Sequence, residues 1–306
     1  MKLYLVLSAS ILFQSFSLSQ TNETFKAINK ALINPESVKT LELNCSEISV
    51  LIEHSQDFTK LESLYLRACK LTQLPSGFAN LKNLRLLNLE DNQLKALPKD
   101  LNSLKELRVI NLRQNNFKKL PKVLLSYPQL REIDLSHNPA LNLGKTIDFL
   151  AQVEKLDFLY LSANNLSLIP PAFSQLKALE ELHLDGNPNL DFGNSFQTLS
   201  ELPALKILVL SNNKLEMIAQ ELILMTGLNG LVLDSNPELN LTDLFSYLPE
   251  LPELKVLLLR DNQLKLLPED LSNLKSLAVL ELSDNNFSEN EKERIKEALP
   301  ETNVVF

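Results

Sequence analysis

The residue types that carry most catalytic and metal chemistry are few in this chain of 306 residues. There are three histidines, His54, His137 and His183, and two cysteines, Cys45 and Cys69. The motifs of phosphate-binding loops, zinc peptidases and serine hydrolases (G-x-x-x-x-G-K-[ST], H-E-x-x-H and G-x-S-x-G) do not occur. The sequence therefore predicts no enzyme active site, no catalytic residues, no cofactor and no bound metal.

A leucine pattern that recurs along the chain must position whatever residues the protein uses. The stretch from Leu84 to Pro98 reads L-x-x-L-x-L-x-x-N-x-L-x-x-L-P. Apolar residues alternate across Leu87 and Leu89, which is a strand period, and the Asn and Pro then end the strand. Related stretches, spaced by 23 or 26 residues, begin at Val38, Leu61, Leu84, Leu107, Leu130, Leu156, Leu179, Leu205, Leu228, Leu254 and Leu277. We expect each to form one coil, a strand followed by a return segment.

This pattern resembles the leucine-rich repeat family over roughly residues 38 to 288. The resemblance implies an α/β solenoid: a curved right-handed coil with one parallel sheet on its concave face and 3₁₀ or short helices on its convex face. It also implies that the Asn at the ninth position of most coils, from Asn92 to Asn285, bonds buried loop backbone rather than a ligand. The three 26-residue coils share an Asn-Pro-x-Leu turn and are expected to carry the longer convex helices.

The first 19 residues are typical of a secretory signal peptide. A lysine is followed by an apolar run to Phe13, and Ser17 and Ser19 supply small residues before an expected cut that leaves Gln20 at the new terminus. The apolar run is short for a membrane span. A buried first helix or an uncleaved anchor is the alternative interpretation.

The remaining segments predict one domain with capped ends. Residues 20–37 are expected to form an N-terminal helical cap, because Phe25, Ile28 and Leu32 have helical spacing and Asn34-Pro35 ends the helix. Residues 38–288 are eleven leucine-rich repeats. Residues 289–306 are expected to form a C-terminal cap, with a helix that follows a capping-box pattern at Ser288 and a final short strand.

The histidines and cysteines fall on this frame without forming a site. His137 and His183 belong to coils separated by a third, so strands about 4.8 Å apart would hold them about 10 Å from each other, too far to share zinc without other ligands. His54 is expected to be a solvated convex residue. Cys45 and Cys69 lie in adjacent coils, and a disulfide is open, but the outward direction of the eighth position favours two free thiols.

The residues most able to bind a partner are those of the strands that point away from the leucine core. In the carboxy-terminal half they form an apolar, partly aromatic strip that is expected to be half exposed. The candidate partner-binding residues are Phe158, Tyr160, His183, Ile207, Val209, Val232, Val256 and Leu258. An apolar patch of this kind suggests an interface. Strand propensity alone is an equal alternative, because Val and Ile favour any sheet.

Charge and composition limit the classes of partner and function that the chain can have. The net charge of −8 argues against nucleic acid as a partner, because neutralising phosphates requires a basic face. We expect a non-enzymatic, monomeric protein-binding module of exported bacterial type, secreted or periplasmic, with no membrane span after cleavage. A cytoplasmic adaptor of the Ras-group leucine-rich-repeat kind is the alternative. An enzyme is a distant third, since the caps leave no room for a catalytic domain.

Overall fold

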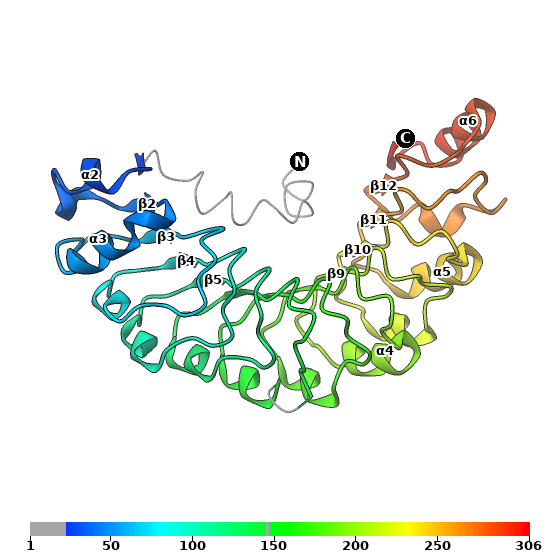
Figure 1. Cartoon of the computed structure of the whole chain (residues 1–306). Coiled ribbons are helices and arrows are strands. Elements are labelled where there is room, and N and C mark those ends of the chain that lie inside the picture. The colour runs from blue at the N-terminus through cyan, green and yellow to red at the C-terminus, as the bar shows by residue number, and fades with distance from the viewer. Residues whose placement is uncertain (1–22, 145–146) are drawn as a thin grey trace.

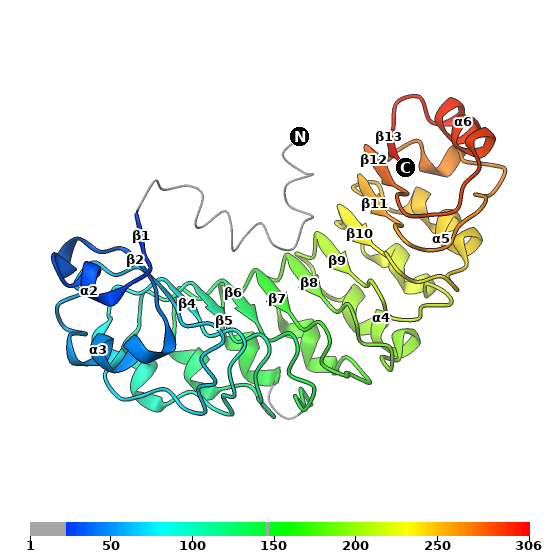
Figure 2. The same cartoon turned by 45° about the horizontal axis from the view of Figure 1, so that its top comes forward.

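The chain forms one curved parallel sheet with short helices on its outer side. The structure, a computed structural model, describes residues 23–144 and 147–306, so the expected signal peptide at residues 1–19 lies outside it. The described strands form a single 13-stranded sheet in which every strand pairs with its neighbours in chain order. Figures 1 and 2 show the chain bent into an arc with the strands along its inner side. The predicted fold class, a leucine-rich-repeat solenoid, is confirmed.

The strands are short and paired in a constant register. β1 has two residues and each of the others has three, and every pairing is parallel. Their bounds are β1 Thr24–Phe25, β2 Thr40–Glu42, β3 Ser63–Tyr65, β4 Leu86–Asn88, β5 Val109–Asn111, β6 Glu132–Asp134, β7 Phe158–Tyr160, β8 Glu181–His183, β9 Ile207–Val209, β10 Gly230–Val232, β11 Val256–Leu258, β12 Val279–Glu281 and β13 Asn303–Val305.

The return segments are mostly 3₁₀ turns on the convex side. Prolines such as Pro98 and Pro121 lie directly before these turns and limit longer helices. The 3₁₀ segments are η1 Pro35–Ser37, η2 Cys45–Glu47, η3 Phe78–Asn80, η4 Lys99–Ser103, η5 Lys122–Ser126, η6 Ile147–Gln152, η7 Pro171–Gln175, η8 Gln220–Leu224, η9 Leu248–Glu250 and η10 Ser272–Leu274. The α-helices are α2 Ile28–Ala31, α3 Ile48–Glu53, α4 Phe192–Ser200, α5 Leu241–Tyr247 and α6 Glu289–Ala298. Two 26-residue coils carry α4 and α5, whereas the third carries the 3₁₀ segment η6.

The leucine pattern builds one continuous core between the sheet and the convex side. The central residue of each strand from β2 to β12, such as Leu87 or Ile110, is completely buried in it. Phenylalanines of the return segments, among them Phe78, Phe117 and Phe173, fill the space farther from the sheet. Because each coil contributes one layer, its apolar side chains are buried only when neighbouring coils are present.

A ladder of asparagines holds the loops that follow the strands. Asn138 is fully buried, and its Nδ2 donates to the carbonyl oxygens of Leu112 at 3.0 Å and Leu135 at 2.9 Å. Its Oδ1 accepts the backbone N–H of Phe117 at 3.0 Å. The residue directly before each ladder Asn has a positive φ, as at His137 with 55° and Ala163 with 52°. This left-handed backbone disfavours residues with a Cβ, and the buried amide bonds help to hold it in place.

The amino-terminal cap differs from its prediction. The described part of the expected helical cap, residues 23–37, contains the strand β1, with Phe25 in it, the four-residue helix α2 and the 3₁₀ segment η1. Phe25 pairs with Leu41 of β2, because the first full coil would otherwise leave its sheet edge open. The helix is attached through Glu47, whose Oε1 accepts the backbone N–H of Ile28 at 2.8 Å.

The carboxy-terminal end closes the other edge of the array. Ser288 caps α6 by accepting the N–H of Glu291, and Glu291 Oε1 in turn accepts the N–H of Leu267 at 2.9 Å. β13 then adds a last strand to the sheet. In the described part of the chain no helix is both long enough and apolar enough to cross a membrane.

The expectation of two free thiols is wrong. Cys45 and Cys69 form a disulfide with a Cα–Cα distance of 5.0 Å, within the usual range. The outward direction assumed for the eighth position does not apply here, because the first coil leaves the repeat pattern. After β2 the chain enters η2 at Asn44, with a capping box to Glu47, and this turn brings Cys45 beside the next coil.

Candidate functional site

The candidate residues lie in two rows across the sheet, on the face opposite the leucine core. Strand register places Glu132, Phe158, Glu181 and Ile207 side by side in the first row. The same pairings place Asp134, Tyr160, His183 and Val209 side by side in the third row. The second residue of each strand belongs to the leucine core, so the alternation of a strand directs both rows to the concave side.

Most of the predicted apolar strip forms a second hydrophobic cluster, separate from the leucine core. It contains Val209, Val232, Val256, Leu258 and Val279, with Ile207 packed against it. Val279 was not among the predicted residues. The expected half exposure is wrong, since Val256 is only 1% exposed.

The other predicted residues lie in a polar neighbourhood beside this cluster. Tyr160 and His183 are buried, and their ring centroids are 4.4 Å apart. His183 Nε2 lies 2.6 Å from Glu181 Oε1, and its Nδ1 lies 3.9 Å from Asp185 Oδ1. Phe158 is partly exposed. The structure thus separates the predicted strip into an apolar cluster and an aromatic, acidic neighbourhood.

Two buried carboxylates dominate this neighbourhood, and neither was among the residues predicted from the sequence. Glu132 is 4% exposed and Glu181 is 2% exposed. Glu132 Oε1 and Glu181 Oε2 are buried without a hydrogen-bond partner. A buried carboxylate oxygen without a partner is costly, so these two groups weaken the fold as it stands.

The pKa of Glu132 reflects its burial and its acidic neighbours. Burial, with further contributions from the negative charges of Asp134 and Glu181, raises the pKa of Glu132 to about 8. Burial also raises the pKa of Asp134, although hydrogen bonds from Ser136 and the charges of Arg113 and His183 oppose the shift. Glu132 therefore holds a proton at neutral pH as long as no positive charge approaches it.

Several polar residues in the third row of the sheet, unlike Glu132 and Glu181, accept a hydrogen bond from the nearby backbone. Asn88, Asn111 and Asp134 each accept the backbone N–H of the residue two positions ahead, at 2.8 to 2.9 Å. Such a bond satisfies the side chain within its own strand end. The first-row position of Glu132 and Glu181 offers no equivalent donor, because the backbone around it is engaged in the sheet.

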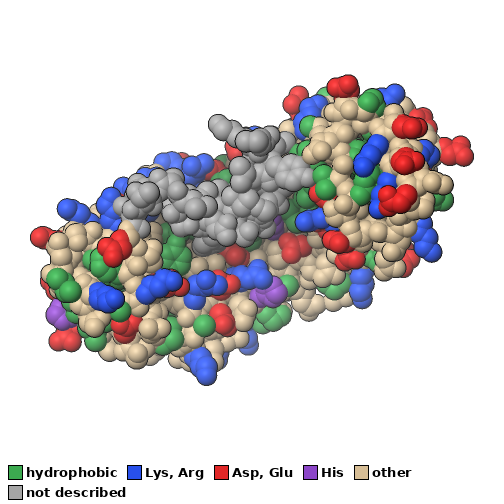
Figure 3. Space-filling view, turned by 90° about the horizontal axis from the view of Figure 1, so that it is seen from above, with side chains coloured by type: hydrophobic (Ala, Val, Ile, Leu, Met, Phe, Trp, Pro, Cys, Tyr) green, Lys and Arg blue, Asp and Glu red, His purple; other side chains and the backbone are tan. Residues whose placement is uncertain are grey.

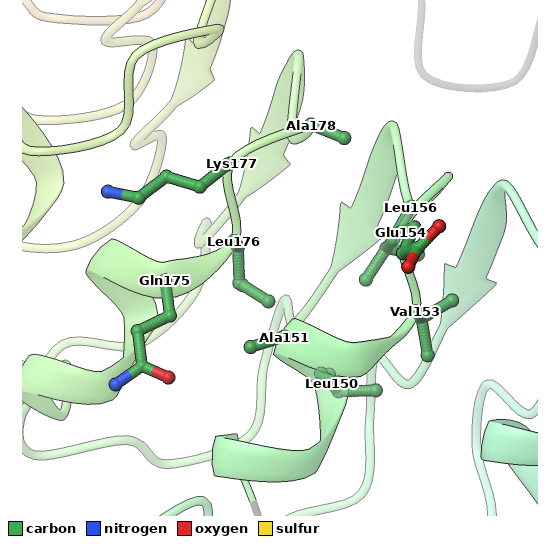
Figure 4. A pocket seen from close by; sticks show the side chains of 9 residues that line it. All are labelled: Leu150, Ala151, Val153, Glu154, Leu156, Gln175, Leu176, Lys177 and Ala178. Atoms are coloured by element: carbon green, nitrogen blue, oxygen red, sulfur yellow. The ribbon is translucent and has the colours of Figure 1, made fainter.

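A cavity between two return segments offers less chemistry. A cavity of about 360 Å³ lies between η6 and η7 and is lined mainly by aliphatic side chains, with Glu154 and Lys177 as its charged groups (Figure 4). It contains no histidine or cysteine. Across residues 23–144 and 147–306 no group of three acidic, histidine or cysteine side chains is arranged to hold a metal ion.

Charge on the open side of the arc is unevenly distributed. Basic side chains form a row over the amino-terminal half, whereas acidic and basic ones are mixed at the end that carries α6 (Figure 3). In the amino-terminal half, Glu90 pairs with Arg67 at 3.0 Å and with Arg113 at 3.7 Å. These partly exposed pairs contribute little to stability.

Comparison with known proteins agrees with this architecture. The model of the family described as "Leucine rich repeat" matches residues 59–117 and 82–139, and a second leucine-rich-repeat model matches residues 155–176 and 253–274. The chain is a leucine-rich-repeat protein. No curated protein matches the sequence.

Two solved structures are similar to this leucine-rich-repeat protein. An internalin from Listeria monocytogenes is 20% identical, with 86% of this chain and 87% of that chain covered and a TM-score of 0.57. A leucine-rich-repeat protein of Leptospira interrogans is 25% identical, with 93% of this chain and 100% of that chain covered and a TM-score of 0.38. The internalin has the same fold, and at this identity the likeness extends no further.

Proposed function

We propose that this leucine-rich-repeat protein is a non-enzymatic module, exported from the cell, that binds a protein partner on its concave face. The observation that carries the proposal is the second hydrophobic cluster, from Val209 to Val279, on the face of the sheet that the leucine core does not use. The leucine core lies on the other face of the sheet, so this cluster is a separate apolar surface, and the partly exposed Ile207 is the member that a partner can contact. The partly exposed Phe158 and Ile207 flank Glu181 in the first row and supply contact area.

Export is supported by two features at the amino-terminal end. Residues 1–19 have the composition of a secretory signal peptide. The disulfide between Cys45 and Cys69 is of a kind that persists in oxidising compartments and is rare in the cytosol. The same disulfide argues against the alternative, a cytoplasmic adaptor, because reducing conditions would open it.

The binding face is tested with substitutions that leave the leucine core intact. Once a partner has been isolated from the extracellular medium, Phe158→Ala and Ile207→Ala, both at partly exposed positions, should each weaken its binding by on the order of 2 kcal/mol, about 30-fold. Lys99→Ala is the matched control, since Lys99 is exposed in η4 on the convex side. Tyr160→Phe is preferable to Tyr160→Ala, because Tyr160 is buried against His183.

The outcome of this comparison decides which face binds. Loss of affinity in both concave variants, with unfolding midpoints near that of the native protein, supports the proposal. Full affinity in both, together with loss in Lys99→Ala, would place the partner on the convex side and reduce the apolar cluster to strand propensity.

A further inference from the structure

We infer that Glu132 and Glu181 are the receptor for one cationic side chain, a lysine or an arginine, presented by the bound protein. The inference rests on the proposed function and adds the chemistry of the partner to it. Its starting point is that both carboxylates, more than nine-tenths buried, each have an oxygen without a hydrogen-bond partner.

The two carboxylates are placed to act on one ligand group. Glu132 on β6 and Glu181 on β8 lie on either side of Phe158 of β7, in the same row of the sheet. They are close enough that the charge of Glu181 contributes to the raised pKa of Glu132. Their strands stand about 10 Å apart, so one positive group can meet both carboxylates only if the two long glutamate side chains lean toward each other over Phe158.

The protein itself does not supply that positive group. Within the described ranges, no lysine or arginine forms an ion pair with Glu132 or Glu181. His183 contacts Glu181 Oε1, which leaves Oε2 unpaired. By comparison, Asp234 two strands away receives two nitrogens of Arg260, at 2.9 and 2.6 Å. The sheet can thus pair a concave carboxylate with arginine, and it does not do so here.

The surroundings favour a long side chain over a bare ion. Val109, Phe158 and Ile207 are the row neighbours of the two glutamates, and all are apolar. The aliphatic stem of lysine or arginine can lie on such surface while its head reaches the carboxylates. A cation over the face of Phe158 gains a further attraction to the ring. A divalent metal would need more oxygen ligands than this place offers.

Binding of a cation here should release a proton. The charged or titratable groups that face Glu132 are Asp134 on its own strand, Tyr160 on β7, and Glu181 and His183 on β8, with Arg113 after β5 acting on Asp134. A positive group among them lowers the pKa of Glu132, which then ionises. Affinity for the cation should therefore increase as pH rises from 6 toward 8.

The test uses a charged probe and an uncharged copy of it. Binding of N-acetyl-arginine amide and of N-acetyl-citrulline amide is measured by calorimetry, since citrulline keeps the shape and loses the charge. The native protein should bind the arginine probe at least tenfold more tightly than the citrulline probe, with proton release visible between buffers of different ionisation enthalpy. Glu132→Gln and Glu181→Gln should each reduce that preference by tenfold or more.

A control variant and a calcium titration complete the experiment. Glu154→Gln, at an exposed position before β7, should retain the full preference for arginine. Equal binding of the two probes to the native protein, or an arginine preference that survives in both site variants, would overturn the inference. If a variant fails to fold, the native comparison and its proton release still decide. Tighter binding of calcium chloride than of the arginine probe would also overturn it.

These outcomes are distinct from those that test the binding face. Loss of partner binding in Phe158→Ala with unchanged partner binding in Glu132→Gln and Glu181→Gln would keep the proposed function and remove the cation receptor. Partner binding that is insensitive to every concave change would remove the proposed function itself.

Discussion

Replacing Glu132 by Gln should stabilise the protein at high pH and change little at low pH. Glu132 has a pKa raised from 4.5 to about 8 in the folded chain, mainly by burial. In the unfolded chain the group returns to its ordinary value. Between these two pKa values the folded state holds a proton that the unfolded state has lost, so the stability contributed by this group is present below pH 4.5 and is lost as pH rises toward 8.

The size of the effect follows from the pKa difference. Each tenfold change in the proton equilibrium is worth about 1.4 kcal/mol, so a pKa raised from 4.5 to about 8 corresponds to at most about 5 kcal/mol at pH 9. The ionisation of Glu132 is coupled to that of Asp134 and Glu181, so removing the Glu132 carboxyl also changes the free energy of ionising these two groups and reduces the net effect. We therefore expect Glu132→Gln to stabilise the fold by about 2 to 4 kcal/mol at pH 9. At pH 5 the change should be within about 0.5 kcal/mol, because a protonated carboxyl and an amide are similar in size.

The measurement is urea unfolding of both proteins at pH 5, 7 and 9, with the difference between them compared across pH. Comparing differences removes the titration of groups that are not coupled to Glu132. Glu154→Gln, the same change at an exposed position, serves as the control. A stability difference for Glu132→Gln that is the same at pH 5 and pH 9 would refute the argument that burial suppresses ionisation of this group.

Three further predictions concern the frame and the compartment. Asn164→Ala should lower the free energy of unfolding by about 2 to 3 kcal/mol, because its buried amide bonds the backbone of Leu135 and Asn138. Asn165→Ala, at an exposed position, should lower it by only about 1 kcal/mol, because Asn165 has a positive φ. Equal unfolding midpoints for the two variants would contradict the role of the asparagine ladder. Thiol titration of denatured, unreduced protein should detect no free thiol, and reduction should destabilise the fold by about 3 kcal/mol, given the 24-residue separation of the cysteines. Mass spectrometry of the native protein should show a start at or near Gln20, and an intact Met1 would favour the cytoplasmic adaptor.

The fold was predictable because its determinants are periodic. A leucine at the central position of a strand and an Asn at the following turn repeat often enough that each coil confirms the others. Strand positions follow from alternation alone, and β4 is centred on Leu87 as the pattern requires. Where the pattern is interrupted the prediction fails: the first coil turns early at Asn44, and this local change brings Cys45 against Cys69.

The candidate site was only partly predictable, for a different reason. The sequence identifies which side chains share the concave face, and so it finds Phe158, Tyr160 and the valine cluster. It does not reveal burial on that face or which polar atoms lack partners, because both depend on how neighbouring strands converge. Glu132 and Glu181 occupy the same row as Phe158, and that shared position was the one available signal.

The two glutamates conflict with the rest of the fold in an informative way. Polar residues at the ends of the same strands bond their own backbone, as Asn111 does with the N–H of Arg113 at 2.8 Å. Leucine or valine fills the first-row position in neighbouring coils, as at Leu86 and Val109, so an apolar residue fits there. A carboxylate at this place weakens the fold, and sequences tend to retain such local conflicts where binding requires them. A positive side chain from outside would turn the same two unpaired oxygens into charge-assisted hydrogen bonds, so the groups that weaken the free protein would strengthen its complex.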